Sequence, residues 1–231
     1  MKYNFKMVEF IFLLILVIVW GMLYVPLNSI SALRHADYGT YFITHLDTII
    51  PYSTKLFFVY VLLYCLPLLV VMIFFKTKYN IIIARKICAA YIMTYLIGYI
   101  IYLAFPNSTY LLIKDMFPTM CSKTKGLIYY FNSHITTDYG ANPSLHIATA
   151  WLYIKSWFEY YPKSLFKKYT STFLTAWFIL LLISIVTLKY HYIFDALCGF
   201  FLGEIMYSLI VRNDLLKTIK WDVVISIKKL L

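Results

Sequence analysis

The sequence predicts an all-α integral membrane bundle of six transmembrane helices, with both termini in the cytoplasm. Three observations lead to this prediction: the composition, six apolar segments, and the distribution of basic residues. Of the 231 residues, 62% are hydrophobic and only 13% are charged, whereas a soluble domain is roughly half apolar and about a quarter charged. Lipid is therefore the expected solvent. No internal repeat interrupts the pattern, and we interpret residues 1–231 as one domain.

Six segments are long enough, or nearly so, to cross a bilayer. Crossing ~30 Å of hydrocarbon takes about 20 helical residues. The candidates are 9–27, 56–75, 87–105, 145–161, 172–188 and 194–211. The first is long for a signal peptide and no small-residue cleavage site follows it, so we interpret it as an uncleaved span. The fourth contains Lys155, whose side chain we expect to extend towards the interface.

The basic residues predict the orientation. If the N-terminus is inside, fifteen of the 21 Lys and Arg residues are cytoplasmic, and the outer six are Arg34, Lys55, Lys114, Lys123, Lys125 and Lys189. Basic residues favour the cytoplasmic side, so both termini are expected there. The long loops 28–55 and 106–144 are then outside. The net charge of +11 lies between apolar segments rather than on one soluble domain, which argues against a nucleic-acid-binding protein.

The cysteines and histidines indicate no metal centre. None of the four cysteines forms a CxxC pair or a Cys/His array with zinc spacing. We therefore expect no disulfide framework, structural metal or cofactor. All five histidines fall on the outer side in this topology, which suggests chemistry at that face.

The first polar cluster is Asn142-Pro143-Ser144-Leu145-His146, at the start of the fourth span. Asn142 is a suitable N-cap and Pro143 suits a first helical turn, so a plain helix start explains part of the pattern. A helix start does not explain His146, because an imidazole inside a membrane helix costs free energy unless it is hydrated, paired or used.

The second cluster runs from Lys189 to Asp195, at the start of the sixth span. His191 and Asp195 are four residues apart and share a helix face. A carboxylate in that position can hold the imidazole in one tautomer and raise its basicity. The alternative is a buried His–Asp pair in which each side chain satisfies the hydrogen bonding of the other and neither has a catalytic role.

Together the two clusters predict a phosphate site at the outer face. Both open helices that run inward, and helix N-termini attract anions. Ser144 adds a hydroxyl and Lys189 a positive charge. A histidine backed by a carboxylate can attack phosphorus, and a second histidine can protonate the departing oxygen.

At these residues the chain resembles the type 2 phosphatidic acid phosphatase superfamily. Asn142–His146 is similar to that family's Pro-Ser-x-His motif, and His191 with Asp195 matches its His-x-x-x-Asp motif. The resemblance implies a phosphohistidine at His191, oriented by Asp195, with His146 as acid and then base. It also implies that Ser144 and Lys189 bind phosphate oxygens.

The sequence departs from the family pattern in two places. Ile185 stands where the second motif has arginine, and the Lys-x6-Arg-Pro motif after the third span has no clean match. A phenylalanine-proline segment at Phe105-Pro106 and the lysine before His191 are similar to the inositol phosphorylceramide synthase-like branch. Lys114, Lys123 and Lys125 could supply further charge for phosphate.

The leading hypothesis is a metal-independent lipid phosphatase in a plasma or inner membrane, with its active site on the extracytoplasmic side. Its substrate is a lipid phosphate or pyrophosphate. One alternative is a phosphotransferase that moves a phospho-head group to a lipid or polyol hydroxyl. The other is a non-catalytic membrane protein that retains the fold.

Glu204, within the sixth span, is expected to be structural, and Asp47 in the first outer loop is a weak candidate for the site entrance. The sequence indicates neither the specific lipid nor an oligomeric state.

Overall fold

The computed structural model describes residues 11, 15–34, 44–65, 81–109, 142–161 and 163–213, which contain helices and no strand. The named helices are α2 (Tyr24–Arg34), α3 (His45–Ile49), α5 (Ile81–Ala104), α9 (Leu145–Tyr160), α10 (Leu165–Thr187), α11 (Ile193–Met206) and the π-helical turn η2 (Tyr207–Arg212). Residues 15–22 and 57–65 are also helical. The predicted all-α class is confirmed for the described residues.

Three described helices are long and apolar enough to cross a membrane. They are Ile83–Ala104, Leu165–Thr187 and Ile193–Arg212, and they correspond to the third, fifth and sixth predicted spans. A shorter apolar helix, Ile15–Leu27, overlaps the first. The fourth predicted span corresponds to α9, which has 16 residues. Part of the second predicted span and both termini lie outside the described residues, so the six-span count and the orientation stay predictions.

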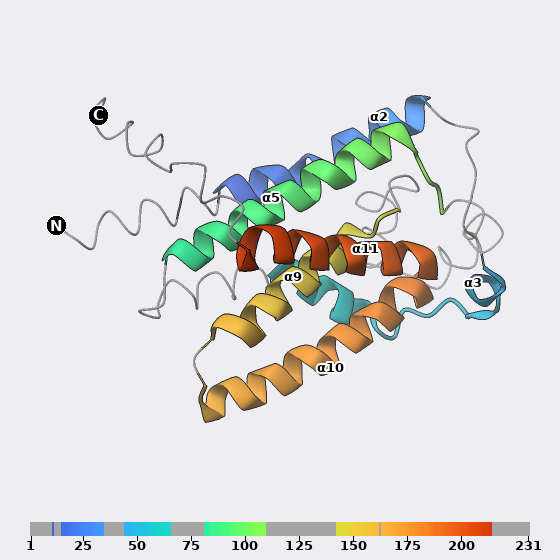
Figure 1. Cartoon of the computed structure of the whole chain (residues 1–231). Helices are drawn as coiled ribbons and strands as arrows, with labels where there is room; N and C mark the ends of the chain where they lie inside the picture. Colours follow the sequence, from blue (N-terminus) through green and yellow to red (C-terminus); the bar gives the residue numbers. More distant parts are fainter. Residues whose placement is uncertain are drawn as a thin grey trace, which may run out of the picture.

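Helix α9 is the centre of the described bundle, in contact with α5, α10 and α11. Figure 1 shows that α9 and α11 begin at the end of the bundle where α5 and α10 finish. The two helices that carry the polar clusters are therefore parallel, as predicted from the sequence. Their N-termini share one end of the molecule with the segment that follows α5.

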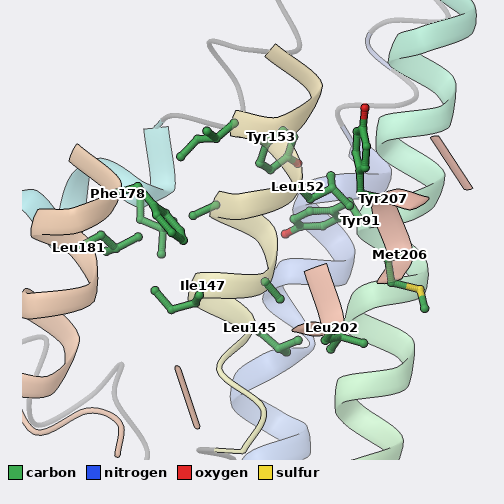
Figure 2. Close-up of a cluster of buried hydrophobic side chains, with 14 of the residues drawn as sticks. Tyr91, Leu145, Ile147, Leu152, Tyr153, Phe178, Leu181, Leu202, Met206 and Tyr207 are labelled. Carbon is green, nitrogen blue, oxygen red and sulfur yellow. The ribbon is translucent and has the colours of Figure 1, made fainter. Parts of the chain in front are cut away.

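The core is built around α9 and is rich in aromatic side chains. Ile147, Leu152 and Tyr153 of α9 are fully buried. Figure 2 shows them between residues of α10 on one side and residues of α5 and α11 on the other. Burial of large apolar and aromatic side chains stabilises the arrangement and fixes the relative positions of the helices.

Two glycines allow α9 and α11 to approach closely. A Cβ atom on Gly199 would overlap the main-chain carbonyl of Ser144, and one on Gly203 would lie 2.5 Å from the carbonyl oxygen of Ala148. Small residues four apart on a helix face let two membrane helices pack backbone to backbone. In this chain they set the separation of the helices that carry His146 and His191.

An ion pair joins the same two helices further from the polar clusters. The Lys155 ammonium lies 3.0 Å from Glu204 Oε1, and the Trp151 indole N–H donates to Glu204 Oε2 at 2.7 Å. The structure thus gives Lys155 a partner within the bundle, and its extension towards the membrane interface stays a prediction. For Glu204 the contacts agree with the structural role predicted from its position.

Candidate active site

The start of α9 presents Ser144 and His146. Ser144 is the N-cap, because its Oγ accepts the Ile147 N–H at 3.5 Å, so the predicted N-cap, Asn142, is corrected. The Ser144 N–H donates to the Asp195 main-chain oxygen at 3.0 Å. Tyr102 of α5 donates its hydroxyl to the Pro143 carbonyl at 2.6 Å. The bond to Asp195 fixes the start of α9 against the first turn of α11, and the bond from Tyr102 fixes it against α5.

The start of α11 holds the carboxylate of Asp195, which is fully buried. Asp195 Oδ2 accepts the main-chain N–H of Tyr192 at 2.9 Å. Its other oxygen, Oδ1, accepts the side-chain amide of Asn107 at 3.2 Å. Asn107 follows α5, in the segment where the family's first motif has no clean match. Two donors therefore hold the carboxylate in place beside the imidazole of His191.

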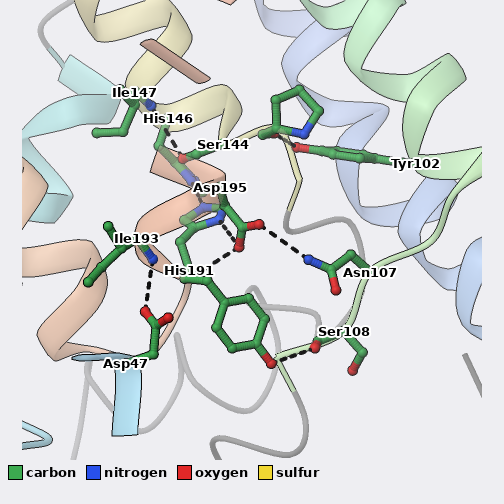
Figure 3. A network of polar contacts seen from close by, with 12 residues as sticks. Asp47, Tyr102, Asn107, Ser108, Ser144, His146, Ile147, His191, Ile193 and Asp195 are labelled. Carbon is green, nitrogen blue, oxygen red and sulfur yellow. Dashed lines mark hydrogen bonds and ion pairs between the residues drawn. The ribbon is translucent and has the colours of Figure 1, made fainter. Parts of the chain in front are cut away.

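The two histidines face each other directly. His146 Nδ1 lies 2.8 Å from His191 Nε2, and His191 Nδ1 lies 3.8 Å from Asp195 Oδ2. His191 is 2% exposed, while His146 is partly buried. Figure 3 shows the row from His146 through His191 to Asp195, with Asn107 beyond the carboxylate. The structure thus brings the three predicted catalytic residues together, with Ser144 beside them.

The N-terminus of α11 is capped by the protein's own carboxylates. Besides the Tyr192 N–H on Asp195, the Ile193 N–H donates to Asp47 Oδ1 at 2.9 Å (Figure 3). Asp47 is 1% exposed and belongs to α3. Carboxylates occupy the favourable anion position at this helix end. Two N–H groups at the α11 N-terminus are therefore occupied by carboxylates, which makes this helix end less available to phosphate than the sequence alone predicts.

Lys189 lies in the turn between α10 and α11, with a φ of 62° in the left-handed region that side chains other than glycine seldom adopt. Its side chain is 1% exposed. The ammonium donates to the main-chain oxygens of Asp47, at 2.7 Å, and Ile50. Burial lowers the pKa of this ammonium, and the Asp47 carboxylate opposes part of the shift. The predicted phosphate ligand is therefore tied to the α3 loop.

The other predicted sources of positive charge are not among the described residues. Lys114, Lys123 and Lys125 all lie outside them. Ile185, at the position of the family arginine, is fully buried in the apolar core. Ile185 therefore offers no positive charge to a phosphate, and the contribution of the three lysines stays a prediction.

Sequence reasoning missed Asn107 and Tyr60, which contact the site, and it expected Asp47 at the site entrance rather than as a cap of α11. Asn107 binds Asp195, and Asp47 caps α11. Tyr60, in the helix of residues 57–65, lies with its hydroxyl 3.1 Å from His146 Nε2. Each comes from a segment remote in sequence from both motifs. The only sequence signal for Asn107 was its position after the phenylalanine-proline segment. No sequence signal distinguished Tyr60, because it is one of 23 tyrosines.

Comparison with known proteins gives one match. The profile described as the PAP2 superfamily matches residues 40–209, which is most of the chain and includes both polar clusters. No curated protein and no solved structure matches the chain significantly.

Proposed function

Because this chain belongs to the PAP2 superfamily, we propose that it is a membrane lipid phosphatase acting through a phosphohistidine intermediate. The observation that carries the proposal is the contact of His146 Nδ1 with His191 Nε2 at 2.8 Å, with the Asp195 carboxylate behind His191. Two imidazoles that meet at the starts of parallel helices can act on the two sides of one phosphoryl group.

In the first step His191 is the nucleophile. Its Nε2 attacks phosphorus, the N–P bond forms, and the bond from phosphorus to the ester oxygen breaks. Protonated His146 gives a proton to the departing oxygen. Asp195 orients His191 and stabilises the charge on its ring, as the carboxylate of a catalytic triad does. Tyr192 and Asn107 keep that carboxylate in position.

In the second step water replaces the departed alcohol. Neutral His146 takes a proton from water, the oxygen attacks phosphorus, and the N–P bond breaks to release phosphate. His191 returns to its starting state and His146 is again protonated. No other group gains or loses a proton over the cycle.

Phosphate oxygens need donors and positive charge. Ser144 is fully buried at the start of α9, beside His146, and we assign its hydroxyl to one phosphate oxygen. Lys189 uses two N–H groups on main-chain oxygens, so we assign most of the positive charge to Lys114, Lys123 and Lys125. A lipid substrate fits this reading, since three described helices are long and apolar enough to span a membrane, and one of them, Ile193–Arg212, begins at the site. By the distribution of basic residues, the site faces the extracytoplasmic side.

The test is phosphate release from lipid monophosphates and pyrophosphates by the purified protein in mixed micelles. Release is expected to persist with a chelator present and to be inhibited by vanadate. His191→Ala should abolish both turnover and the acid-labile phosphoenzyme, whereas His146→Ala should still form phosphoenzyme from a substrate with a good leaving group.

The same preparations decide between this proposal and its alternatives. A protein that releases no phosphate from any of these lipids, yet passes a phospho-head group to an added lipid hydroxyl, is a transferase. A protein with neither activity is the non-catalytic relative, for which the apolar Ile185 is the main argument.

A further inference from the structure

Both ring nitrogens of His146 have a partner. Nδ1 faces His191, and Nε2 lies 3.1 Å from the hydroxyl of Tyr60. That hydroxyl lies in turn 2.9 Å from the hydroxyl of Tyr64, one helical turn further along the same helix. The mechanism proposed above uses only the Nδ1 side of His146, so it leaves the two tyrosines without a role.

Tyr60 is fixed by its surroundings. It is 1% exposed, and its ring centroid lies 5.2 Å from that of His146 and 4.9 Å from that of Tyr190. The ring of Tyr24, from α2, meets the His146 ring edge-on at 6.1 Å. Aromatic rings packed in this way leave a side chain little rotational freedom. The Tyr60 hydroxyl is therefore a fixed point against which His146 can be oriented.

We propose that Tyr60 is a positioning residue for His146, with a role like that of Asp195 towards His191. This inference rests on the proposed function. The Nε2–H of His146 donates to the Tyr60 oxygen, and the Tyr60 O–H donates to Tyr64. The proton on Nε2 is thereby held in place, so Nδ1 is the nitrogen that gives and takes a proton at the phosphoryl group.

The need for such a residue follows from the two roles of His146. After His146 has protonated the departing oxygen, its neutral ring has one proton, which can sit on either nitrogen. A proton on Nδ1 would prevent that nitrogen from accepting one from water. Because the Tyr60 hydroxyl gives its own proton to Tyr64 in this arrangement, it can only accept from His146, which favours the tautomer with the proton on Nε2. The proton given to the ester oxygen leaves Nδ1, the proton from water returns to Nδ1, and both tyrosines keep theirs throughout.

A second reason comes from the space for substrate. Two nitrogens 2.8 Å apart leave no room for a phosphoryl group between them. Substrate binding therefore requires His146 and His191 to separate. Because Tyr60 holds the far side of the His146 ring, it sets the position to which that ring returns once phosphate has left.

The first experiment compares Tyr60→Phe with wild type on substrates that differ only in leaving group. General acid–base catalysis contributes about 10²–10⁴-fold, and we expect loss of the orienting hydroxyl to remove about tenfold of it. Turnover of an alkyl phosphate should fall by that factor. With an aryl phosphate that needs no acid, phosphorylation should stay fast while hydrolysis slows, so acid-labile phosphoenzyme should accumulate above the wild-type level.

Tyr153→Phe is the matched control. Tyr153 is also a fully buried tyrosine, on α9, and its hydroxyl has no hydrogen-bond partner among the described residues. It should behave as wild type with both substrates. An equal loss on both leaving groups without phosphoenzyme accumulation would show that Tyr60 only supports the fold, and wild-type rates on both would remove it from the mechanism.

The second experiment does not depend on turnover. Nitrogen-15 NMR of histidine-labelled protein reports which ring nitrogen carries the proton. Neutral His146 should be protonated on Nε2 in wild type and in Tyr153→Phe, and should become a mixture of tautomers in Tyr60→Phe. An unchanged tautomer in Tyr60→Phe overturns the inference. If Tyr60→Phe shows the tautomer shift but the wild-type protein releases no phosphate, the result would instead count against the proposed function.

Discussion

At the scale of single residues, Asp195 draws its partners from two parts of the chain. Tyr192 and His191 are local to its helix, whereas Asn107 comes from the segment after α5. A carboxylate held by two donors needs no reorganisation when charge develops on the neighbouring imidazole. Asp195→Asn should therefore keep the fold yet cut the rate by orders of magnitude.

Asn107 offers a finer test of this network. Asn107→Ala removes one hydrogen bond to a charged acceptor, worth about 1.5–3 kcal/mol, so the catalytic efficiency should fall by about ten- to a hundredfold. Asn107→Asp should lose more, because it sets a second negative charge against Asp195. The measurement is steady-state phosphate release. Thr94→Ala is the control, because within the described part of the chain the Thr94 hydroxyl donates to the Ala90 carbonyl of its own helix, at 2.7 Å, and not to a site residue. Equal activity of Asn107→Ala and the control would show that Asn107 does not support Asp195.

The contacts of Lys189 predict an effect on stability. Lys189→Met would leave two main-chain oxygens without their donor, and an unsatisfied buried group costs about 1–3 kcal/mol. Thermal unfolding in detergent should show that loss, while Lys168→Met, on an exposed side chain, should unfold like wild type. If Lys189→Met instead unfolds like wild type and loses catalytic efficiency, the ammonium acts on the phosphate, as the sequence first indicated.

At the scale of helices, the contact between α9 and α11 decides how close the two histidines can come. Main-chain atoms of the two helices touch at Gly199 and Gly203. The bond from the Ser144 N–H to the Asp195 carbonyl fixes the register at the end where the histidines lie. A side chain introduced at this contact must move one helix, because a main-chain carbonyl cannot rotate out of the way.

The expected outcome for Gly199→Ala is a large loss of activity, since its new methyl group would press on Ser144, the N-cap of the helix that carries His146. Gly98→Ala on α5 is the comparison: the three atoms nearest its Cβ all belong to the Leu145 side chain rather than to a main chain, and a side chain can shift more easily than a helix backbone. Phosphate release and thermal unfolding of both variants should be compared. Similar losses in both would mean that close backbone packing at Gly199 has no special role.

At the scale of the whole molecule, the features that the sequence predicted are those that depend on short local patterns of residues. The parallel starts of α9 and α11 follow from hydrophobic segments and helix-start residues, and the i, i+4 spacing of His191 and Asp195 follows from helix geometry. The contacts of Asp47, Asn107 and Tyr60 with the site region depend on how remote segments pack. The pairing of Lys155 with Glu204, 49 residues apart, is equally non-local, and no periodicity in a single sequence reports it.

The orientation in the membrane is a prediction that labelling can test. A cysteine introduced by Lys125→Cys should react with a membrane-impermeant reagent added outside intact cells. The distribution of basic residues places that loop outside and the loop before α10 inside. Lys163→Cys should therefore react only after permeabilisation. The reverse pattern would place the site on the cytoplasmic side.

The pairing of Lys155 with Glu204 also has a consequence for biogenesis. Helix α9 has 16 residues and carries Lys155 and, four residues later, Glu159, and it is shorter than the ~20 residues needed to cross the hydrocarbon. The neutralising carboxylate is synthesised 49 residues later, on α11. A buried charge without its partner is costly in lipid. Because Glu204 is the ion-pair partner of Lys155, we expect α9 to be held stably in a bilayer only once α11 has packed against it.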